Sequence, residues 1–211
     1  MLIVLEGIDG CGKTTVIEKV LAHLVSLNID AIATSEFGCQ FPWAAELRKE
    51  LMANTGDPFA QYHTVLKARD AHMNDVLRPA QQWDKIVLMD RYVMSTMAYQ
   101  GQSPFTPVRQ IMDDHVNVYN FPVADLTIVL SCTVSTAMKR LQATGKKLDA
   151  FDSASREFFS NAHEIYISAA HAIQRQKPDK VRIVDAEQPL DKVLHDVINA
   201  VSGLIMTRDV A

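Results

Sequence analysis

The clearest chemical signature lies at positions 7–14, where the letters GIDGCGKT match G-x-x-x-x-G-K-[ST] at every fixed position. Glycines in such a loop let successive backbone N–H groups turn toward one anion. Lys13 is expected to reach the β- and γ-phosphates of a nucleotide, and the Thr14 hydroxyl is expected to bind Mg²⁺. The motif therefore predicts a nucleoside triphosphate site and leaves the second substrate unidentified.

Three further charged residues extend this prediction. Asp9 lies inside the loop, where phosphate repels a carboxylate unless a metal ion or an acceptor hydroxyl intervenes; a solvated turn is the alternative. Asp90 ends the apolar run 86–89, which is the Walker-B pattern of a Mg²⁺-binding aspartate, although it could also cap the next helix. Arg91 follows and could clamp a second phosphate with two N–H groups, or form an ion pair at the surface.

The elements that must position these residues alternate along the chain. Short apolar runs predict strands at 2–5, 31–34, 86–89, 126–130 and 181–184. Amphipathic segments predict helices at 13–27, 43–53, 58–78 (ending before Pro79), 92–100, 107–118, 135–143, 153–174 and 190–201. This order predicts an α/β, three-layer P-loop fold with a five-stranded parallel sheet flanked by helices. Ligands bind at the carboxyl ends of such strands, so the loops after Leu5, Thr34, Met89 and Leu130 are expected to line one cleft.

Length and composition limit the class of protein. The 211 residues, 48% of them hydrophobic, predict a single domain over 1–211. A net charge of −4 argues against a broad nucleic-acid surface, so no nucleic-acid partner is expected. There is no apolar run of ~18 residues, and the N-terminus lacks a signal-peptide pattern, so no membrane partner is expected. The three scattered cysteines suggest a reducing compartment, and we expect a cytoplasmic protein.

Beyond the loop, the sequence resembles the thymidylate kinase family. Residues 90–101, DRYVMSTMAYQG, resemble the family's D-R-x-x-x-S-x-x-A-Y-Q-G, and residues 6–15, EGIDGCGKTT, resemble E-G-x-[DE]-G-x-G-K-T-T. Segments 68–72 and 78–80 resemble the family's helix before the third strand. Asp125-Leu126-Thr127 and Asp185-Ala186 resemble the start of its fourth strand and the end of its fifth. The resemblance extends over nearly the whole chain.

This resemblance implies a phosphotransferase that moves the γ-phosphate of ATP to a deoxynucleoside monophosphate, with Mg²⁺ as cofactor and a homodimer as the common assembly. The catalytic residues would be Lys13, Asp9 and Arg91, and the metal ligands would be Thr14 and Asp90. Arg140 would lie against adenine. The implied ATP-binding residues are Gly7, Gly10, Cys11, Gly12, Lys13, Thr14, Thr15 and Arg140.

The resemblance also implies a set of acceptor-binding residues. Arg48 and Arg91 would hold the acceptor phosphate, Arg69 would reach the base edge, and Tyr99 would pack where a ribose 2′-OH would otherwise lie. Glu36 is a candidate acidic residue near the acceptor. The full set is Asp9, Glu36, Arg48, Val65, Arg69, Arg91, Ser95, Thr96, Tyr99 and Gln100.

Three segments depart from the family pattern. The family's T-R-E-P-G-G is TSEFGC here, at positions 34–39, and retains only Glu36 of its charged pair. Val65 stands where the family has a phenylalanine that stacks on thymine, and such stacking is worth ~1–3 kcal/mol on nucleic-acid bases. The lid, about residues 141–153, has no arginine and offers Lys146 and Lys147, which supply charge without a fork of donors, or are simply solvated.

These departures leave three functions open. The first is a kinase for dTMP or a related deoxynucleotide. The second is a kinase specific for another base, such as dGMP or a 5-modified deoxyuridylate, because Val65 offers a smaller platform. The third is a nucleotide-binding regulator without transfer activity, because the lid lacks arginine.

Overall fold

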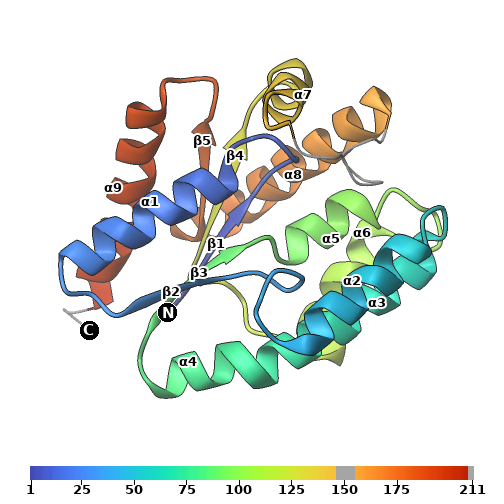
Figure 1. Ribbon diagram of the computed structural model, residues 1–211, viewed down its shortest axis with the longest axis horizontal. Helices are drawn as coiled ribbons and strands as arrows, with labels where there is room; N and C mark the ends of the chain where they lie inside the picture. Colours follow the sequence, from blue (N-terminus) through green and yellow to red (C-terminus); the bar gives the residue numbers. More distant parts are fainter. Residues whose placement is uncertain (146–154, 209–211) are drawn as a thin grey trace.

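The computed structural model describes residues 1–145 and 155–208, in which five parallel strands form one sheet between layers of helices (Figure 1). The strands follow the order β2-β3-β1-β4-β5, and every neighbouring pair is parallel. Their bounds are β1 Leu2–Glu6, β2 Ala31–Thr34, β3 Ile86–Asp90, β4 Leu126–Ser131 and β5 Val181–Asp185. The prediction of a parallel α/β sheet flanked by helices is confirmed.

The central strand β1 is apolar at nearly every position because both of its faces are covered. Leu2 and Val4 belong to one hydrophobic cluster, whereas Ile3 and Leu5 belong to the other. This alternation follows from the two-residue period of a strand. The edge strand β2 is only partly buried, which explains its weak, alanine-rich sequence pattern.

Helices cover both faces of the sheet. Helices α1 and α9 pack against each other on one face, and α5 and α8 pack against each other on the opposite face (Figure 1). No helix in the described ranges has the length and apolarity needed to span a membrane. The helices are α1 Lys13–Ser26, α2 Pro42–Ala53, α3 Pro58–His72, α4 Arg78–Gln82, α5 Val93–Tyr99, α6 Val108–Asp113, α7 Val134–Ala143, α8 Arg156–Gln176 and α9 Leu190–Arg208.

Two predicted helix ends are wrong: the helix expected to stop before Pro79 continues to Gln82, and the helix expected at 190–201 continues to Arg208. A π-helical turn, Met73–Leu77, joins α3 to α4, and the Arg78 N–H donates to the Met73 carbonyl five residues back. Pro79 then falls in the first turn of α4, where its missing N–H costs little. A second π turn, Asp114–Val118, follows α6, and a 3-10 turn, Pro178–Lys180, precedes β5.

The predicted lid falls mostly in a part of the chain that the structure does not describe. Helix α7 ends at Ala143 and α8 begins at Arg156. Lys146 and Lys147 lie outside the described residues, so their expected role stays a prediction.

Candidate active site

The loop between β1 and α1 is held against β4 and α7 so closely that two positions accept only glycine. Gly7 has φ +139°, and a Cβ there would lie 2.5 Å from the Leu130 carbonyl oxygen. Gly10 has φ +82°, and its Cβ would lie 2.2 Å from the Ala137 carbonyl oxygen. Glycine is therefore required here both for conformation and for space.

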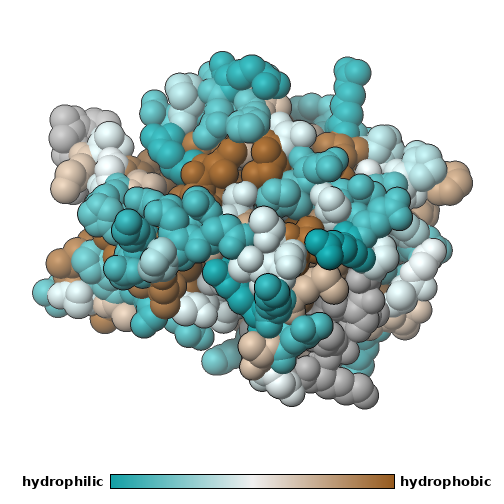
Figure 2. Space-filling view, turned by 90° about the horizontal axis from the view of Figure 1, so that it is seen from above, coloured by the Kyte–Doolittle hydropathy of each residue, from teal (hydrophilic) through white to brown (hydrophobic). Residues whose placement is uncertain are grey.

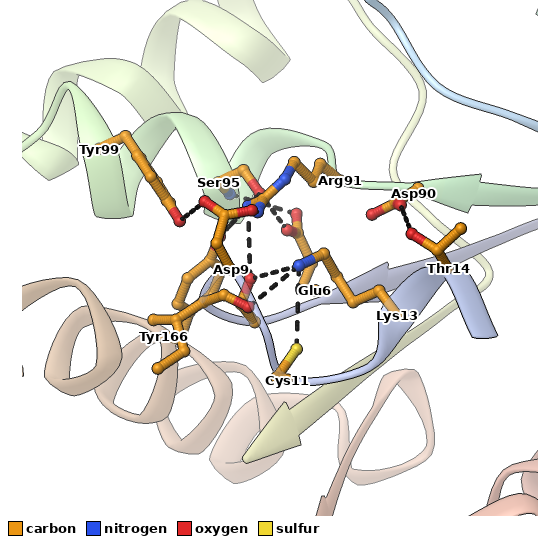
Figure 3. A network of polar contacts seen from close by, with 12 residues as sticks. Glu6, Asp9, Cys11, Lys13, Thr14, Asp90, Arg91, Ser95, Tyr99 and Tyr166 are labelled. Carbon is orange, nitrogen blue, oxygen red and sulfur yellow. Dashed lines mark hydrogen bonds and ion pairs between the residues drawn. The ribbon is translucent and has the colours of Figure 1, made fainter. Parts of the chain in front are cut away.

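Lys13 begins α1 and reaches back across this loop (Figure 3). Its Nζ donates to the carbonyl oxygens of Gly7 at 3.0 Å and Ile8 at 3.1 Å, and it lies 3.8 Å from Cys11 Sγ. The side chain is 5% exposed. A nearly buried cation beside a helix N-terminus creates the positive environment that a phosphate group requires.

Thr14, in the first turn of α1, and Asp90, at the end of β3, bring a hydroxyl and a carboxylate together. Thr14 Oγ1 donates to Asp90 Oδ2 at 3.4 Å. Asp90 Oδ1 is buried, and no residue of the described ranges forms a hydrogen bond with it. A buried carboxylate oxygen without a partner, next to a threonine hydroxyl, fits Mg²⁺, which takes few protein oxygens and completes its shell with phosphate and water. Within the described residues no group of three His, Cys, Asp or Glu could hold a metal ion.

Asp9 lies in a polar network rather than in a solvated turn. Its Oδ1 is paired with Arg91 Nη2, and its Oδ2 accepts a hydrogen bond from the Tyr99 hydroxyl at 2.7 Å. Burial acts to raise the pKa of Asp9, but the charges of Arg91 and Lys13 and the Tyr99 bond outweigh it and lower the pKa to about 2. Asp9 is therefore ionised at neutral pH.

Arg91 joins the loops that follow β1 and β3. Its Nη1 donates to the Gly7 carbonyl at 3.3 Å, to Ser95 Oγ at 3.3 Å and to the Tyr166 hydroxyl at 3.2 Å. Its guanidinium carbon lies 5.1 Å from the centre of the Tyr99 ring. Burial disfavours the charge, but the neighbouring Asp9 raises the pKa of Arg91 well above its ordinary value. Arg91 is thus a fixed cation and not an isolated surface ion pair.

Glu6 is a fully buried carboxylate that holds the start of α5. Its Oε1 accepts from the Tyr92 N–H at 2.9 Å and the Met94 N–H at 3.1 Å, and its Oε2 accepts from Ser95 Oγ at 2.6 Å. Burial raises the pKa of Glu6, while the Ser95 hydrogen bond and the Arg91 charge act in the opposite direction. Glu6 was not among the predicted site residues. The sequence did carry one indication of this role, because Glu6 is an acidic residue at the end of an apolar strand. Burying a carboxylate there is costly in free energy unless the carboxylate has hydrogen-bond partners.

A cavity of about 250 Å³ opens beside Asp9 and Arg91 and is lined by residues that follow β1, β2 and β3 and by α2, α3 and α5; we call it the acceptor cavity. Figure 2 views the side of the molecule that carries α7 and the β1–α1 loop, where hydrophilic residues cover most of the surface and hydrophobic ones emerge between them. Nine of the ten residues expected to bind the acceptor line this cavity: Asp9, Glu36, Arg48, Val65, Arg91, Ser95, Thr96, Tyr99 and Gln100.

No residue of the loop after β4 lines the acceptor cavity, so the expected place of this loop in a common ligand cleft stays a prediction. This loop leads directly into α7, which begins at Val134. The end of β4 and helix α7 border the β1–α1 loop, where the carbonyl groups of Leu130 and Ala137 lie close to Gly7 and Gly10.

Arg69 is predicted to bind the acceptor nucleotide, but it is not among the residues that line the acceptor cavity. It is 1% exposed, and its Nε and Nη2 donate to the two carboxylate oxygens of Glu36 at 2.6 and 3.2 Å. Nη2 also donates to Thr96 Oγ1 at 2.8 Å. Since Glu36 and Thr96 both line the acceptor cavity, Arg69 orients its polar wall from beneath. Its predicted contact with the base edge stays a prediction.

The apolar wall of the cavity contains residues that the sequence did not single out. Val65 is joined there by Phe37, Leu51 and Met52. Phe37 stands where the family pattern has proline, and this departure from the pattern was the indication in the sequence that could have drawn attention to Phe37. Leu51 and Met52 could not be recognised locally, because their position depends on how α2 packs against α3.

The expected ATP side lies around Cys11. Arg140, on α7, donates from Nη1 to the Cys11 carbonyl at 3.4 Å and from Nη2 to the Ala186 carbonyl at 2.9 Å. It therefore links the phosphate-binding loop to the loop after β5. Thr15 is exposed on the first turn of α1, next to Thr14. The contact of Arg140 with adenine stays a prediction.

Comparisons with known proteins identify the family of the chain. A family model described as thymidylate kinase matches residues 5–197. The chain is 31% identical over 208 residues to a thymidylate kinase of Pseudomonas putida strain W619, covering 97% of this chain and 98% of that protein. It is 32% identical over 196 residues to a thymidylate kinase of Leuconostoc mesenteroides, covering 90% of each. The chain belongs to the thymidylate kinase family.

Proposed function

We propose that the protein is a phosphotransferase that transfers the γ-phosphate of ATP to dTMP and forms ADP and dTDP. The observation that carries this proposal is the acceptor cavity, whose polar end is formed by Asp9 and Arg91, immediately beside the phosphate-binding loop. Membership of the family supports the same reaction, since the relatives are named thymidylate kinases.

ATP would bind with its phosphates against the N–H groups of residues 7–14 and the Lys13 ammonium, and with adenine near Arg140. Thr14 and Asp90 would hold Mg²⁺, which supplies neutralisation of the β- and γ-phosphate charge when bound. Lys13 would exchange its bonds to Gly7 and Ile8 for phosphate oxygens.

The monophosphate would occupy the acceptor cavity with its phosphate against Arg91 and Arg48. Its phosphate oxygen is already ionised at neutral pH, so transfer needs alignment and charge neutralisation more than a general base. Asp9 would hold Arg91 in place rather than take up a proton, because its pKa of about 2 leaves it without one.

Selection of the nucleoside would follow from the rest of the lining. The Tyr99 hydroxyl is fixed by Asp9, so Tyr99 would fill the space beside the sugar and disfavour a 2′-OH. Glu36, Thr96 and Gln100 offer polar atoms for the base edge, and Val65 lies in the apolar wall. The alternatives of another base or of a regulator without activity have no observation in their favour.

The proposal includes the remaining expectations: one kinase domain over 1–211, a homodimer, no nucleic-acid or membrane partner, a cytoplasmic location, and a lid that uses Lys146 and Lys147.

The test is ADP release from ATP and Mg²⁺ with and without dTMP, for the wild type and for Lys13→Ala. The wild type should release ADP only when dTMP is present. Lys13→Ala should lose at least about a hundredfold in kcat, because it removes the nearly buried cation from the phosphate site. Near-normal turnover by Lys13→Ala would contradict the assignment.

A further inference from the structure

Helix α8 places one side chain, Tyr166, directly behind the acceptor site (Figure 3). Tyr166 is fully buried in the core, yet its hydroxyl lies 2.7 Å from Ser95 Oγ and 3.2 Å from Arg91 Nη1. It does not line the acceptor cavity, so it cannot be expected to touch the acceptor. Neither the resemblance nor the composition of α8 singled it out.

The direction of the hydrogen bonds around Tyr166 follows from the bond that the Ser95 hydroxyl donates to Glu6. The Ser95 hydroxyl donates to Glu6 Oε2 at 2.6 Å and has no second hydrogen to donate. Ser95 Oγ is then the acceptor for the Tyr166 hydroxyl. The Tyr166 oxygen in turn accepts an N–H from Arg91 Nη1. The order is therefore Arg91 to Tyr166 to Ser95 to Glu6.

This series of hydrogen bonds complements the ion pair between Arg91 and Asp9. Asp9 holds Arg91 through Nη2, whereas Nη1 is held by Tyr166, Ser95 and the Gly7 carbonyl. A guanidinium that must meet a phosphate in a defined orientation needs both of its ends fixed. Without the Tyr166 hydroxyl, Nη1 and Ser95 Oγ would each lose a partner in a site closed on that side by the core.

We propose that Tyr166 is a positioning residue that aligns Arg91 and Ser95 toward the acceptor phosphate, and thereby makes the packing of α8 against α5 a determinant of acceptor binding. The inference rests on the proposed function, because it takes the acceptor to be a nucleoside monophosphate. A failure of the proposed function would appear as an inactive wild type, and a failure of this inference would appear only in the variants.

The decisive variant is Tyr166→Phe, which keeps the ring and removes the hydroxyl. It should raise KM for dTMP by about tenfold or more and leave KM for ATP within about twofold, because the loss is that of a hydrogen bond to a charged group near one substrate. The matched control is Tyr62→Phe. Tyr62 is also buried and donates to Asp114 Oδ2 at 2.7 Å, but it does not line the acceptor cavity. The control should lose thermal stability and keep both KM values.

A double-mutant cycle tests whether Tyr166 acts through Arg91. In the Arg91→Lys background, Tyr166→Phe should cause little further loss of kcat/KM for dTMP, since the guanidinium it orients is already gone. A full, multiplicative loss in that background would overturn the inference. So would Tyr166→Phe with unchanged KM for dTMP, or with equal increases for dTMP and ATP.

If Tyr166→Phe is too unstable to assay, p-aminophenylalanine at position 166 provides a second variant. Its amine can donate to Ser95 Oγ but is a poor acceptor for Arg91. It should therefore still raise KM for dTMP, and wild-type values with this variant would overturn the inference.

Discussion

At the scale of single residues, Asp9 is the point where the phosphate-binding loop meets the acceptor cavity. A carboxylate at this position repels two anionic substrates. It is nevertheless bonded to Arg91 and Tyr99 and stays ionised. Its effect is to fix one cation and one hydroxyl-bearing side chain that line the acceptor cavity. The carboxylate thus contributes to the site through its partners.

Asp9→Asn should lower kcat/KM for dTMP by about ten- to hundredfold, because Arg91 loses its charged partner. Steady-state kinetics with dTMP varied at saturating ATP measures this loss. Asp30→Asn is the matched control, since Asp30 is exposed and pairs only at the surface with Lys85. It should leave the kinetics unchanged, and an equal effect in both variants would contradict the role given to Asp9.

Phe37 supplies an aromatic ring to the cavity in which Val65 has replaced the ring of the family. Phe37→Ala should raise KM for dTMP by about five- to hundredfold, on the scale of the loss of one stacked base. Phe59→Ala removes a ring of the same size from an exposed position on α3 that contacts His63. That control should bind dTMP as the wild type does. A KM unaffected by Phe37→Ala would exclude this ring from base binding.

Sequence reasoning went furthest where a residue carries its own signal. The glycines and Lys13 belong to a motif with fixed spacing, Asp90 ends an apolar strand, and the structure brings them to one edge of the sheet. It did not identify Tyr166, because a tyrosine in a long amphipathic helix resembles any other core residue. What sets Tyr166 apart is its contact with Arg91, 75 positions away, and only the folded chain shows it.

At the scale of elements, buried strands were predicted well because both faces of β1, β3 and β4 are apolar. The end of the helix near Pro79 was predicted wrongly, because no sequence rule locates the π turn that lets α4 follow α3. The packing of α7 against Gly10 could not be predicted locally either, because it is a contact between distant segments.

Replacing each of two glycines with alanine should change the stability of the protein in opposite directions. Gly10→Ala should lower Tm and abolish most activity, because its Cβ would lie 2.2 Å from the Ala137 oxygen at φ +82°. In Gly203→Ala, on α9, the added Cβ would lie more than 4 Å from the neighbouring atoms. This variant should raise the free energy of unfolding by about 0.5–1 kcal/mol, because alanine favours a helix more than glycine does. Thermal unfolding and dTMP kinetics measure both. Equal effects would contradict the close contact at Gly10.

At the scale of the whole molecule, a net charge of −4 accompanies two polyanionic substrates. The cations that matter are therefore concentrated along one edge of the sheet. Lys13, Arg91 and Arg140 surround the phosphate-binding loop, and Arg48 and Arg69 surround the acceptor cavity.

The stability of the whole molecule should fall in mild acid because of two buried histidines. Burial lowers the pKa of His72 to about 4, with the Arg69 charge acting in the same direction, and lowers the pKa of His115 to about 3. The unfolded histidine has a pKa of 6.5. Between these values the unfolded chain binds more protons, so the stability present above about pH 6.5 is lost as the pH falls.

Urea unfolding of the wild type and His72→Gln across about pH 7 to 4.5 measures this effect. Relative to His72→Gln, the wild type should lose about 1.4 kcal/mol per pH unit once the pH is below about 6, which corresponds to one proton. His195→Gln, at an exposed position on α9, should follow the wild type. A difference between wild type and His72→Gln that does not vary with pH would contradict the prediction.

The central claim is that the acceptor cavity selects thymidylate for phosphoryl transfer. The most direct measurement is diphosphate formation by the wild type from dTMP, its ribose counterpart, dUMP and dGMP, each with ATP and Mg²⁺ and with product separation by chromatography. We predict dTDP as the preferred product, a much lower kcat/KM for the ribose counterpart, and no product from Lys13→Ala. Preference for dGMP, or ATP binding without diphosphate from any of the four monophosphates, would contradict the claim.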